Sequence, residues 1–396
     1  MTALFDSPDE YQYFLYFRDE LLHDLSGHAL DKCWNYVVLQ ACNETTALRN
    51  LTVAIAALSK SKYLCGTSQM HHTFAVHQYG KALRGIQKIV STRTDVDALR
   101  IVLIASLLIF CFESIHGNQD QAIAHAVASL SLMRKRLPTS TCRWSQIQPL
   151  SSIPGLEDAI LEIFIRLDNI IMSRVGHPHS SRRTSILEVS FVSGNFYMPP
   201  AFQNFIEAKT YLEHFQFHAM PYLSRLTDVF LYGEKYACPI RDNAYENLTL
   251  QLRPWYNAFK PLFDRAMRPG DKDFISAATI YCIALSTDIS FQRVCLKPAD
   301  CPKELFEAEV RLIIDLTRKV VMDHRFKKTF SFDCGVVPSL FIAIMICRNR
   351  EIREEAIEIL RLAGDRVETT WVAKDIMALG ERMMQAEEQG MSVFTP

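Results

Sequence analysis

The sequence predicts an all-α protein, a large antiparallel array of about twelve to fifteen helices joined by short connections. Apolar residues recur every three or four positions along most of the chain, and few segments show the alternation that strands need. In addition, 49% of the 396 residues are hydrophobic and 22% are charged. This composition supports a large packed core and argues against disorder.

The N-terminal helices are recognised by their start signals and apolar faces. Ser7 followed by Pro8 predicts a helix over residues 8–25 with serine as its N-cap. Further helices are expected from about residue 31 and from about Thr45. The helix that begins near Thr45 and the one after it carry apolar residues at a spacing typical of helices packed on a core. These residues are Leu48, Leu51, Ile55 and Leu58 in the first, and Val76, Tyr79, Leu83, Ile86 and Val90 in the second.

Two helices, over residues 98–114 and from 118 to about 137, meet at a polar turn in the stretch FCFESIHGNQDQAIAH. Ile101–Phe112 is almost continuously apolar but shorter than the roughly 20 residues that span a membrane, so it predicts a buried core helix. Gly117 fits the C-cap of the first helix, and Asn118 fits the N-cap of the second.

Residues 138–156 are rich in proline and serine and predict a linker. The linker joins an N-terminal helical half, 1–137, to a C-terminal half, 157–396, and we expect the whole to form one continuous globular unit. Residues 176–200 are interpreted as the longest loop. The remaining helices are expected near residues 157–175, 202–232, 242–266, 272–295, 303–323, 336–348, 351–364 and 370–388.

Two local signals in the C-terminal half concern helix geometry. Pro254 and Pro261 fall inside the helix expected at 242–266, which predicts that it is kinked or split. Asp333 precedes the helix expected at 336–348 and is interpreted as its N-cap.

Charge and motif content argue against several functional classes. The net charge is −1 and the basic runs are short, so we expect no direct nucleic-acid contact. The N-terminus lacks the features of a signal peptide, and we expect an intracellular protein, nuclear or cytoplasmic, that is neither secreted nor bound to a membrane. The sequence contains no GxSxG motif, glycine-rich phosphate loop or CxxC pair. His214 and His218 could share an ion, but a third ligand is lacking nearby, so we expect no metal and no cofactor.

Several stretches, in order along the chain, carry a resemblance to a known family. They are YFLYFRDELLHDLSG at 13–27, ALRNLTVAIAALSK at 47–60, HQYGKALRGI at 77–86, LIASLLIFCFESIHGNQDQAIAHAVASLSLM at 103–133, IFIRLDNIIMSRVG at 163–176, FSFDCGVVPSLFIAIMICRNREIREEAIEIL at 330–360 and TWVAKDIMALGERM at 370–383. With these stretches the chain resembles the C-terminal regulatory domain of the fungal-specific transcription factor family, whose members carry an N-terminal binuclear zinc cluster.

The resemblance implies a regulatory domain that senses metabolites, such as those of secondary metabolism, or that binds proteins. Two features depart from the family pattern. The six-cysteine zinc cluster is absent from this sequence, so the expected regulator lacks a DNA-binding module of its own. Residues 367–371 are Val-Glu-Thr-Thr-Trp, whereas relatives tend to have Glu-Gly-x-Trp.

Glu113, His116 and His125 are the candidate catalytic residues, because they surround the polar turn at the end of an apolar helix. A buried carboxylate needs a partner. One interpretation is a structural lock, in which Glu113 bonds a histidine or the backbone and fixes the corner. The other is acid–base chemistry or a polar anchor on a pocket wall.

A large helical array can leave a cavity between its helices, and such cavities bind small molecules. The aromatic-rich segment 187–202 is a candidate lid over such a cavity. Its candidate ligand-binding residues are Phe191, Phe196, Tyr197 and Phe202.

Three functional hypotheses follow from these observations. The first is a ligand-sensing or protein-binding regulatory domain, whose partners are a small apolar ligand and either another protein or a second copy of the chain. The alternative is a scaffold repurposed as a metal-independent enzyme that acts on an apolar metabolite in a cavity between helices. The third is a scaffold without any ligand.

Overall fold

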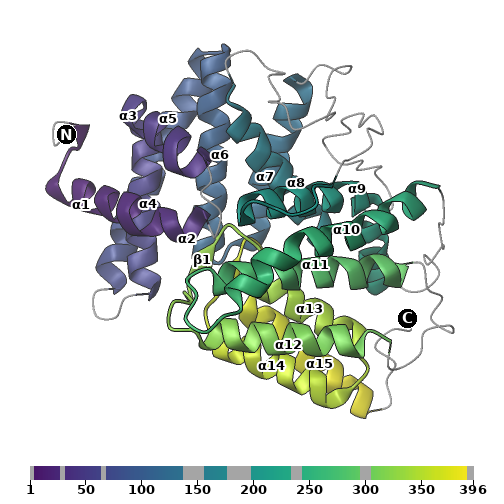
Figure 1. The fold of residues 1–396 in the computed structure, drawn as a ribbon. Helices are drawn as coiled ribbons and strands as arrows, with labels where there is room; N and C mark the ends of the chain where they lie inside the picture. Colours follow the sequence, from purple (N-terminus) through teal and green to yellow (C-terminus); the bar gives the residue numbers. More distant parts are fainter. Residues whose placement is uncertain are drawn as a thin grey trace. The chain divides into compact units, whose positions relative to one another are not determined.

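The computed structural model describes residues 4–26, 32–63, 68–136, 156–175, 198–232, 243–294 and 305–389. Helices dominate these residues (Figure 1), which confirms the all-α fold. The chain forms two compact units. The N-terminal unit comprises Met1–Asp168, Thr184–Phe196 and Thr329–Asp333; the C-terminal unit comprises Asn169–Arg183, Tyr197–Lys328 and Cys334–Pro396. The linker expected at 138–156 lies almost entirely outside the described residues, and the predicted domain division stays a prediction.

The N-terminal unit begins as predicted, with Pro8 in the first helical turn and the Ser7 hydroxyl accepting the backbone N–H of Glu10 at 3.2 Å. Its elements are α1 (Pro8–Tyr16), the π-helical segment η2 (Phe17–Leu21), α2 (Leu22–Ser26), the π-helical segment η3 (Cys33–Val38), α3 (Leu39–Glu44), α4 (Thr46–Tyr63), α5 (Ser68–Thr92), α6 (Val96–His116), α7 (Gln119–Arg136), the start of α8 (Asp158–Val175) and β1 (Phe330–Ser331).

The apolar face predicted for α4 is confirmed. Helix α4 packs against α1, α5 and α6, and Leu48, Leu51, Ile55 and Leu58 are all buried. A helix that is surrounded in this way buries apolar residues around most of its circumference, and α4 does so from Ala47 to Ser59.

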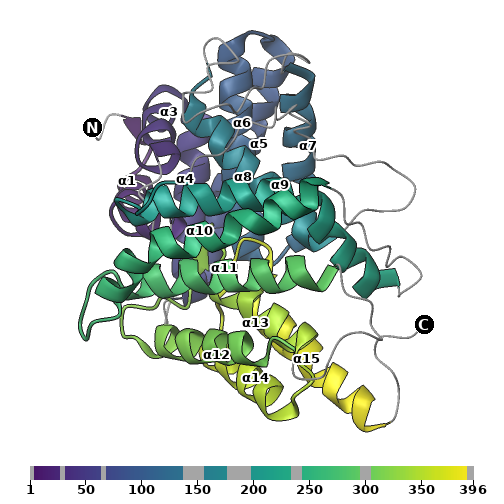
Figure 2. The ribbon, with the colours of Figure 1, turned by 45° about the vertical axis from the view of Figure 1, so that its right-hand side comes forward.

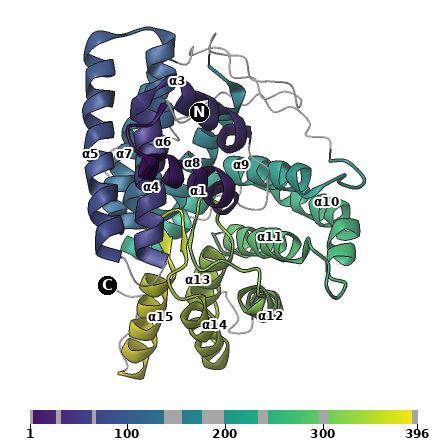
Figure 3. The same cartoon turned by 90° about the vertical axis from the view of Figure 1, so that its left-hand side faces the viewer.

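Helix α5 packs on α4 through small residues, and Figure 3 shows the two helices side by side. It buries Ala75, Gln78 and Ala82, and a Cβ atom at Gly85 would lie 2.8 Å from the Cβ of Ala47, so the two backbones approach closely there. The large apolar residues are not buried on the core, contrary to what their spacing suggested. Val76, Leu83 and Val90 are 45%, 36% and 54% exposed, and Tyr79 and Ile86 are half-buried.

Two helices in the described part of the chain are long and apolar enough to cross a membrane: Val96–His116, which is α6, and Phe274–Arg293. Their apolar windows are 83% and 72% buried inside the protein. Such burial is typical of the core helices of soluble proteins. The core helix predicted at Ile101–Phe112 is confirmed.

The C-terminal unit is a second helical array, in which α9, α10 and α11 lie alongside one another (Figure 2). A hydrophobic core joins α11 to α12, α13, α14 and α15. The elements are α9 (Phe205–Tyr232), α10 (Asn243–Ala266), α11 (Phe274–Val294), α12 (Glu307–Met322), α13 (Val336–Ile346), α14 (Arg350–Ala363), β2 (Val367–Glu368), β3 (Trp371–Val372) and α15 (Ala373–Glu388).

Helix α10 contains Pro254 and Pro261 and is nevertheless one continuous helix from Asn243 to Ala266. The prolines therefore do not split this segment, and the alternative of a kink stays a prediction. Trp255 lies next to the first proline, and its indole N–H donates to the carbonyl of Ala208 on α9 at 2.9 Å. Tertiary packing of this kind holds a helix whose local hydrogen bonding the prolines weaken.

Helix α13 receives its N-terminal cap from a distant residue. The N-cap residue is Gly335 and not Asp333, so the predicted cap is wrong. The Glu368 carboxylate accepts the backbone N–H groups of Gly335 at 2.8 Å, Val336 at 3.3 Å and Val337 at 3.0 Å. A carboxylate can accept several of the free N–H groups of a first helical turn, and its negative charge interacts favourably with the positive end of the helix dipole.

Strands β2 and β3 form a hairpin in which Val367 pairs with Val372 and Glu368 pairs with Trp371. The two-residue loop between them is Thr369-Thr370, and Thr369 has a φ of 55°. A positive φ at the first loop position alone fits a type II′ turn, in which glycine is preferred.

Candidate functional site

Glu113 lies in the last turn of α6, buried except for 8% of its surface. One carboxylate oxygen accepts the Tyr79 hydroxyl of α5 at 2.6 Å, and the other accepts the side-chain amide of Asn118 at 2.7 Å. The backbone N–H groups of Gly117 and Asn118 both donate to the carbonyl of Glu113. Gly117 has a φ of 101°, which confirms the predicted C-cap. Glu113 therefore fixes the end of α6 to α5.

His116 joins this group through Asn118. The Asn118 amide nitrogen, which already donates one hydrogen to Glu113, lies 3.0 Å from His116 Nδ1. Nδ1 therefore accepts the second amide hydrogen, and the neutral His116 ring carries its proton on Nε2. That Nε2 lies 3.2 Å from Nε2 of His72 on α5. The polar turn is thus a hydrogen-bonded series from Glu113 to His72.

His125 is not part of this series. It is half-buried on α7, and its carbonyl accepts the Ser129 hydroxyl at 2.7 Å. The structure therefore brings Glu113 and His116 together through Asn118 and leaves His125 apart. Sequence reasoning missed Tyr79 as the main partner of Glu113, because the two residues are 34 positions apart and on different helices.

The environment of Tyr79 supports a structural role for this cluster. Burial, together with the hydrogen bond to Glu113, raises the pKa of Tyr79 well above its usual range. The ring also stacks on Phe112, with centroids 3.9 Å apart and planes 8° apart. A phenol held in this way stays protonated and donates to the carboxylate, which occupies one oxygen of Glu113 permanently.

Of the four candidate ligand-binding aromatic residues, the structure describes only Phe202. Phe191, Phe196 and Tyr197 lie outside the described residues. Phe202 is buried, and its ring contacts Tyr211 and Trp255 at centroid distances of 5.3 Å and 6.0 Å. Phe202 therefore belongs to the packed interior of the C-terminal unit.

A small pocket is nevertheless lined in part by the end of the predicted lid segment, at Met198, Pro199 and Pro200. It has a volume of about 590 Å³, within the usual range of ligand pockets. Leu250 lines it and is 72% exposed. The other lining residues are Arg253, Pro254 and Asn257.

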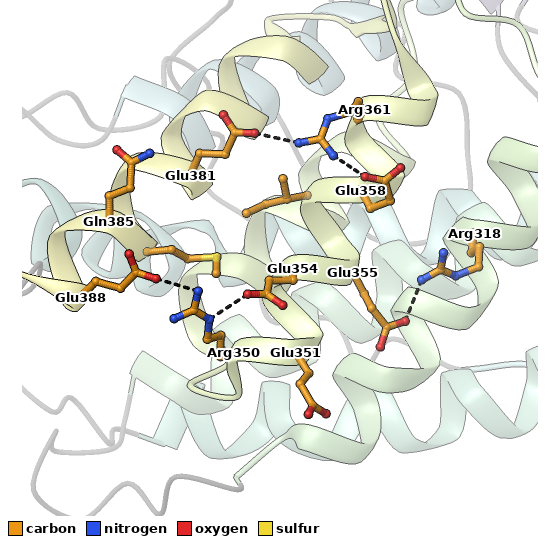
Figure 4. A pocket seen from close by; sticks show the side chains of 12 residues that line it. Arg318, Arg350, Glu351, Glu354, Glu355, Glu358, Arg361, Glu381, Gln385 and Glu388 are labelled. Carbon is orange, nitrogen blue, oxygen red and sulfur yellow. Dashed lines mark hydrogen bonds and ion pairs between the residues drawn. The ribbon is translucent and has the colours of Figure 1, made fainter.

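A larger groove, of about 940 Å³, runs along α14 between α12 and α15 (Figure 4). Arg361 bonds Glu358 on its own helix and Glu381 on α15. At the other end, Arg350 bonds Glu354 and Glu388 of α15. Arg318 of α12 bonds Glu355 at 2.7 Å. Figure 4 shows these arginines as bridges along the groove.

The groove is acidic. Six glutamates and three arginines line it. Glu351, Glu354, Glu355 and Glu358 follow one face of α14 with the spacing of helical neighbours, and the sequence contains this signal. The sequence alone does not show that Glu381 and Glu388 of α15 line the groove, because these residues reach α14 only in the folded protein.

His214 and His218 of α9 face each other, with their Nε2 atoms 3.1 Å apart. Burial, and to a lesser degree the neighbouring ring, lowers the pKa of His214 to about 3. Burial also lowers the pKa of His218. Within the described ranges, no group of three or more His, Cys, Asp or Glu side chains is arranged to hold a metal ion.

Comparison with known proteins gives one match. Residues 12–202 match the family model described as "Fungal specific transcription factor domain". The stretches at 330–360 and 370–383 lie outside the matched residues. The search of curated proteins and the search of solved structures found no match. The match identifies residues 12–202 as a fungal specific transcription factor domain.

Proposed function

We propose that the chain regulates transcription by binding other molecules, and that it reaches promoters through a protein partner instead of contacting DNA itself. The observation that carries the proposal is the family match over residues 12–202. The site of action of such a regulator is the nucleus.

The charge of the chain supports the absence of direct DNA contact. DNA-binding proteins neutralise phosphates with clustered Lys and Arg side chains. This chain has a net charge of −1, and the groove along α14 is lined by twice as many glutamates as arginines. Such a groove repels a phosphate backbone.

The same groove fits a basic segment of a partner protein. Its carboxylates are about half exposed, as Glu354 and Glu358 show with 52% and 48% of their side chains accessible. A carboxylate that already binds one guanidinium can accept further hydrogen bonds. Ile357 and Met384 also line the groove and offer apolar contact to the stem of a lysine or arginine.

A reporter assay tests the proposal. The chain is fused to an unrelated DNA-binding domain, and transcription from a promoter that carries its site is measured. We expect the fusion to change transcription, and the double variant Glu351→Lys with Glu355→Lys to lose most of the effect. Glu20→Lys, a charge reversal at an exposed glutamate of the N-terminal unit, serves as the control. An inert wild-type fusion would count against the regulatory role.

A second candidate function is the binding of a small apolar ligand, favoured by the pocket beside Met198 and Leu250. A ligand that binds there raises the melting temperature in proportion to the logarithm of its concentration. Leu250→Asp should abolish this rise. Catalysis at Glu113 has less support, because Tyr79 and Asn118 occupy both of its oxygens.

A further inference from the structure

The exposed face of α5 carries a regular apolar stripe. We call Val76, Tyr79, Leu83, Ile86 and Val90 the α5 stripe. Its members are three, four, three and four residues apart, which is the seam spacing of a coiled coil. From Val76 to Val90 the stripe extends for about 21 Å along the helix. A stripe of this length can pack against the apolar face of a second helix over about two heptads.

Tyr79 lies at the buried edge of this face, where it stacks on Phe112 and donates to Glu113, whereas Val76, Leu83 and Val90 are left exposed. The packing of α5 on α4 is made by Ala75, Gln78, Ala82 and Gly85, one position away from the stripe. The three largest exposures on the stripe belong to the residues seven positions apart, Val76, Leu83 and Val90. An exposed apolar row with heptad spacing is a common sign of a helix-binding surface.

Gly80 gives a second, independent indication. Glycine inside a helix costs about 1 kcal/mol relative to alanine. Gly85 has a reason within the fold, since a side chain there would collide with Ala47. A Cβ at Gly80 would meet only the Arg84 guanidinium, at 3.6 Å, so the fold does not require glycine there. Gly80 lies between Val76 and Leu83, where a small residue lets another backbone approach closely.

The charge of α5 selects the partner. Its 25 residues include Lys81, Arg84 and Lys88 but no aspartate or glutamate. Lys81 bonds Asp6 and Glu10 of the N-terminal segment. Arg84 and Lys88 are exposed, and the Arg84 guanidinium lies close to Gly80.

We propose that the α5 stripe binds an amphipathic helix of a partner protein, with leucine- or valine-type residues on its apolar face and acidic residues beside them. Two copies of α5 would bring like charges together, which disfavours pairing of this face with a second copy of the chain. The proposal does not depend on the transcriptional role or on the acidic groove of the C-terminal unit.

Fluorescence anisotropy tests the proposal on the full chain. The probe is a labelled amphipathic peptide of about three heptads, with leucine at its seam positions and glutamate beside them. The comparison peptide carries lysine in place of glutamate. We expect the acidic peptide to bind, and to bind more weakly as salt rises. The triple variant Val76→Ser, Leu83→Ser and Val90→Ser should weaken binding by at least about tenfold. Because these side chains are exposed, the fold should persist, and circular dichroism checks it.

The controls separate this surface from others. Leu312→Ser, on α12 of the C-terminal unit, replaces a leucine of nearly the same exposure, 37%, and should bind like the wild type. Arg84→Glu with Lys88→Glu should weaken the acidic peptide and strengthen the lysine peptide. The proposal is overturned if the acidic peptide does not bind, if the triple variant binds it equally, or if both peptides bind alike. A wild-type dimer that the triple variant dissociates would also overturn it, since the occupant is then a second copy.

Discussion

Glu368 accepts the backbone N–H of Gly335 at 2.8 Å and so ties the β2–β3 hairpin to the N-terminus of α13. Its side chain is 1% exposed, and Arg366 bonds it at 3.1 Å. Arg366 in turn donates to the carbonyl of Lys327. Glu368 therefore has a buried structural role.

Replacement of Glu368 by alanine should lower the free energy of unfolding by about 3–5 kcal/mol, because a buried arginine and the first turn of a helix both lose their partner. Glu368→Gln keeps one acceptor and should lose less. Urea unfolding measures both. Glu358→Ala, which breaks an exposed ion pair, is the control and should cost less than about 1 kcal/mol. Equal losses for the buried and the exposed glutamate would contradict this account.

Thr369 adopts the left-handed backbone conformation at φ 55°, which is unfavourable for a β-branched residue. Thr370 beside it is equally buried but is not in that conformation. Thr369→Gly should therefore lose less stability than Thr370→Gly, by about 1 kcal/mol. Thermal unfolding of the two variants gives the comparison. The reverse order would show that the Thr369 side-chain contacts outweigh the backbone strain.

Tyr79→Phe should lower the free energy of unfolding by about 1–3 kcal/mol, because the buried Glu113 carboxylate loses a donor. Glu113→Gln in the same background should recover part of this loss, since a neutral amide tolerates a missing donor better. Tyr36→Phe, at a tyrosine that is 72% exposed, should change stability very little. If the Tyr79→Phe protein is as stable as the wild type, Glu113 does not depend on this hydrogen bond.

The lowered pKa values of His214 and His218 lead us to expect that the free energy of unfolding decreases in acid. Their pKa values are lowered in the folded protein, that of His214 to about 3. In the unfolded chain an imidazole titrates near 6.5, so the unfolded state binds protons first as the pH falls. Stability should therefore decrease progressively below about pH 6.5. His214→Gln should flatten the dependence of the melting temperature on pH, whereas His77→Gln, at an exposed site, should not. Parallel pH profiles for wild type and His214→Gln would exclude this pair as the cause.

Features that depend on residues close together in the sequence, such as helices and two of their caps, were predicted correctly. The helices follow from local periodicity, and the Ser7 and Gly117 caps follow from residue type. The buried face of α5 was missed because hydrophobicity favours the large residues at 76, 83 and 90. Contact with α4 requires small ones, and Ala75 and Ala82 provide them. Whether the large residues or the small residues of α5 face the core is decided by how closely α4 approaches, which the sequence of α5 alone does not show.

The candidate sites were less predictable, because their partners are distant in sequence. Glu113 was identified from the sequence, but Tyr79 was not. Asp333 looked like a cap by position, yet Glu368 reaches the helix from more than thirty residues away. A carboxylate held by tertiary structure can replace a local cap, and only the fold shows where it lies.

The most direct test of the proposed function is the chromatin occupancy of the native chain, tagged at its own locus and compared with the Glu351→Lys, Glu355→Lys variant. DNA mobility shifts with the purified chain accompany the measurement. The account predicts that the wild type occupies promoters while showing no sequence-specific DNA affinity alone, and that the variant leaves chromatin at unchanged protein levels. Absence of the wild-type chain from promoters, or specific DNA binding by the purified chain, would contradict it.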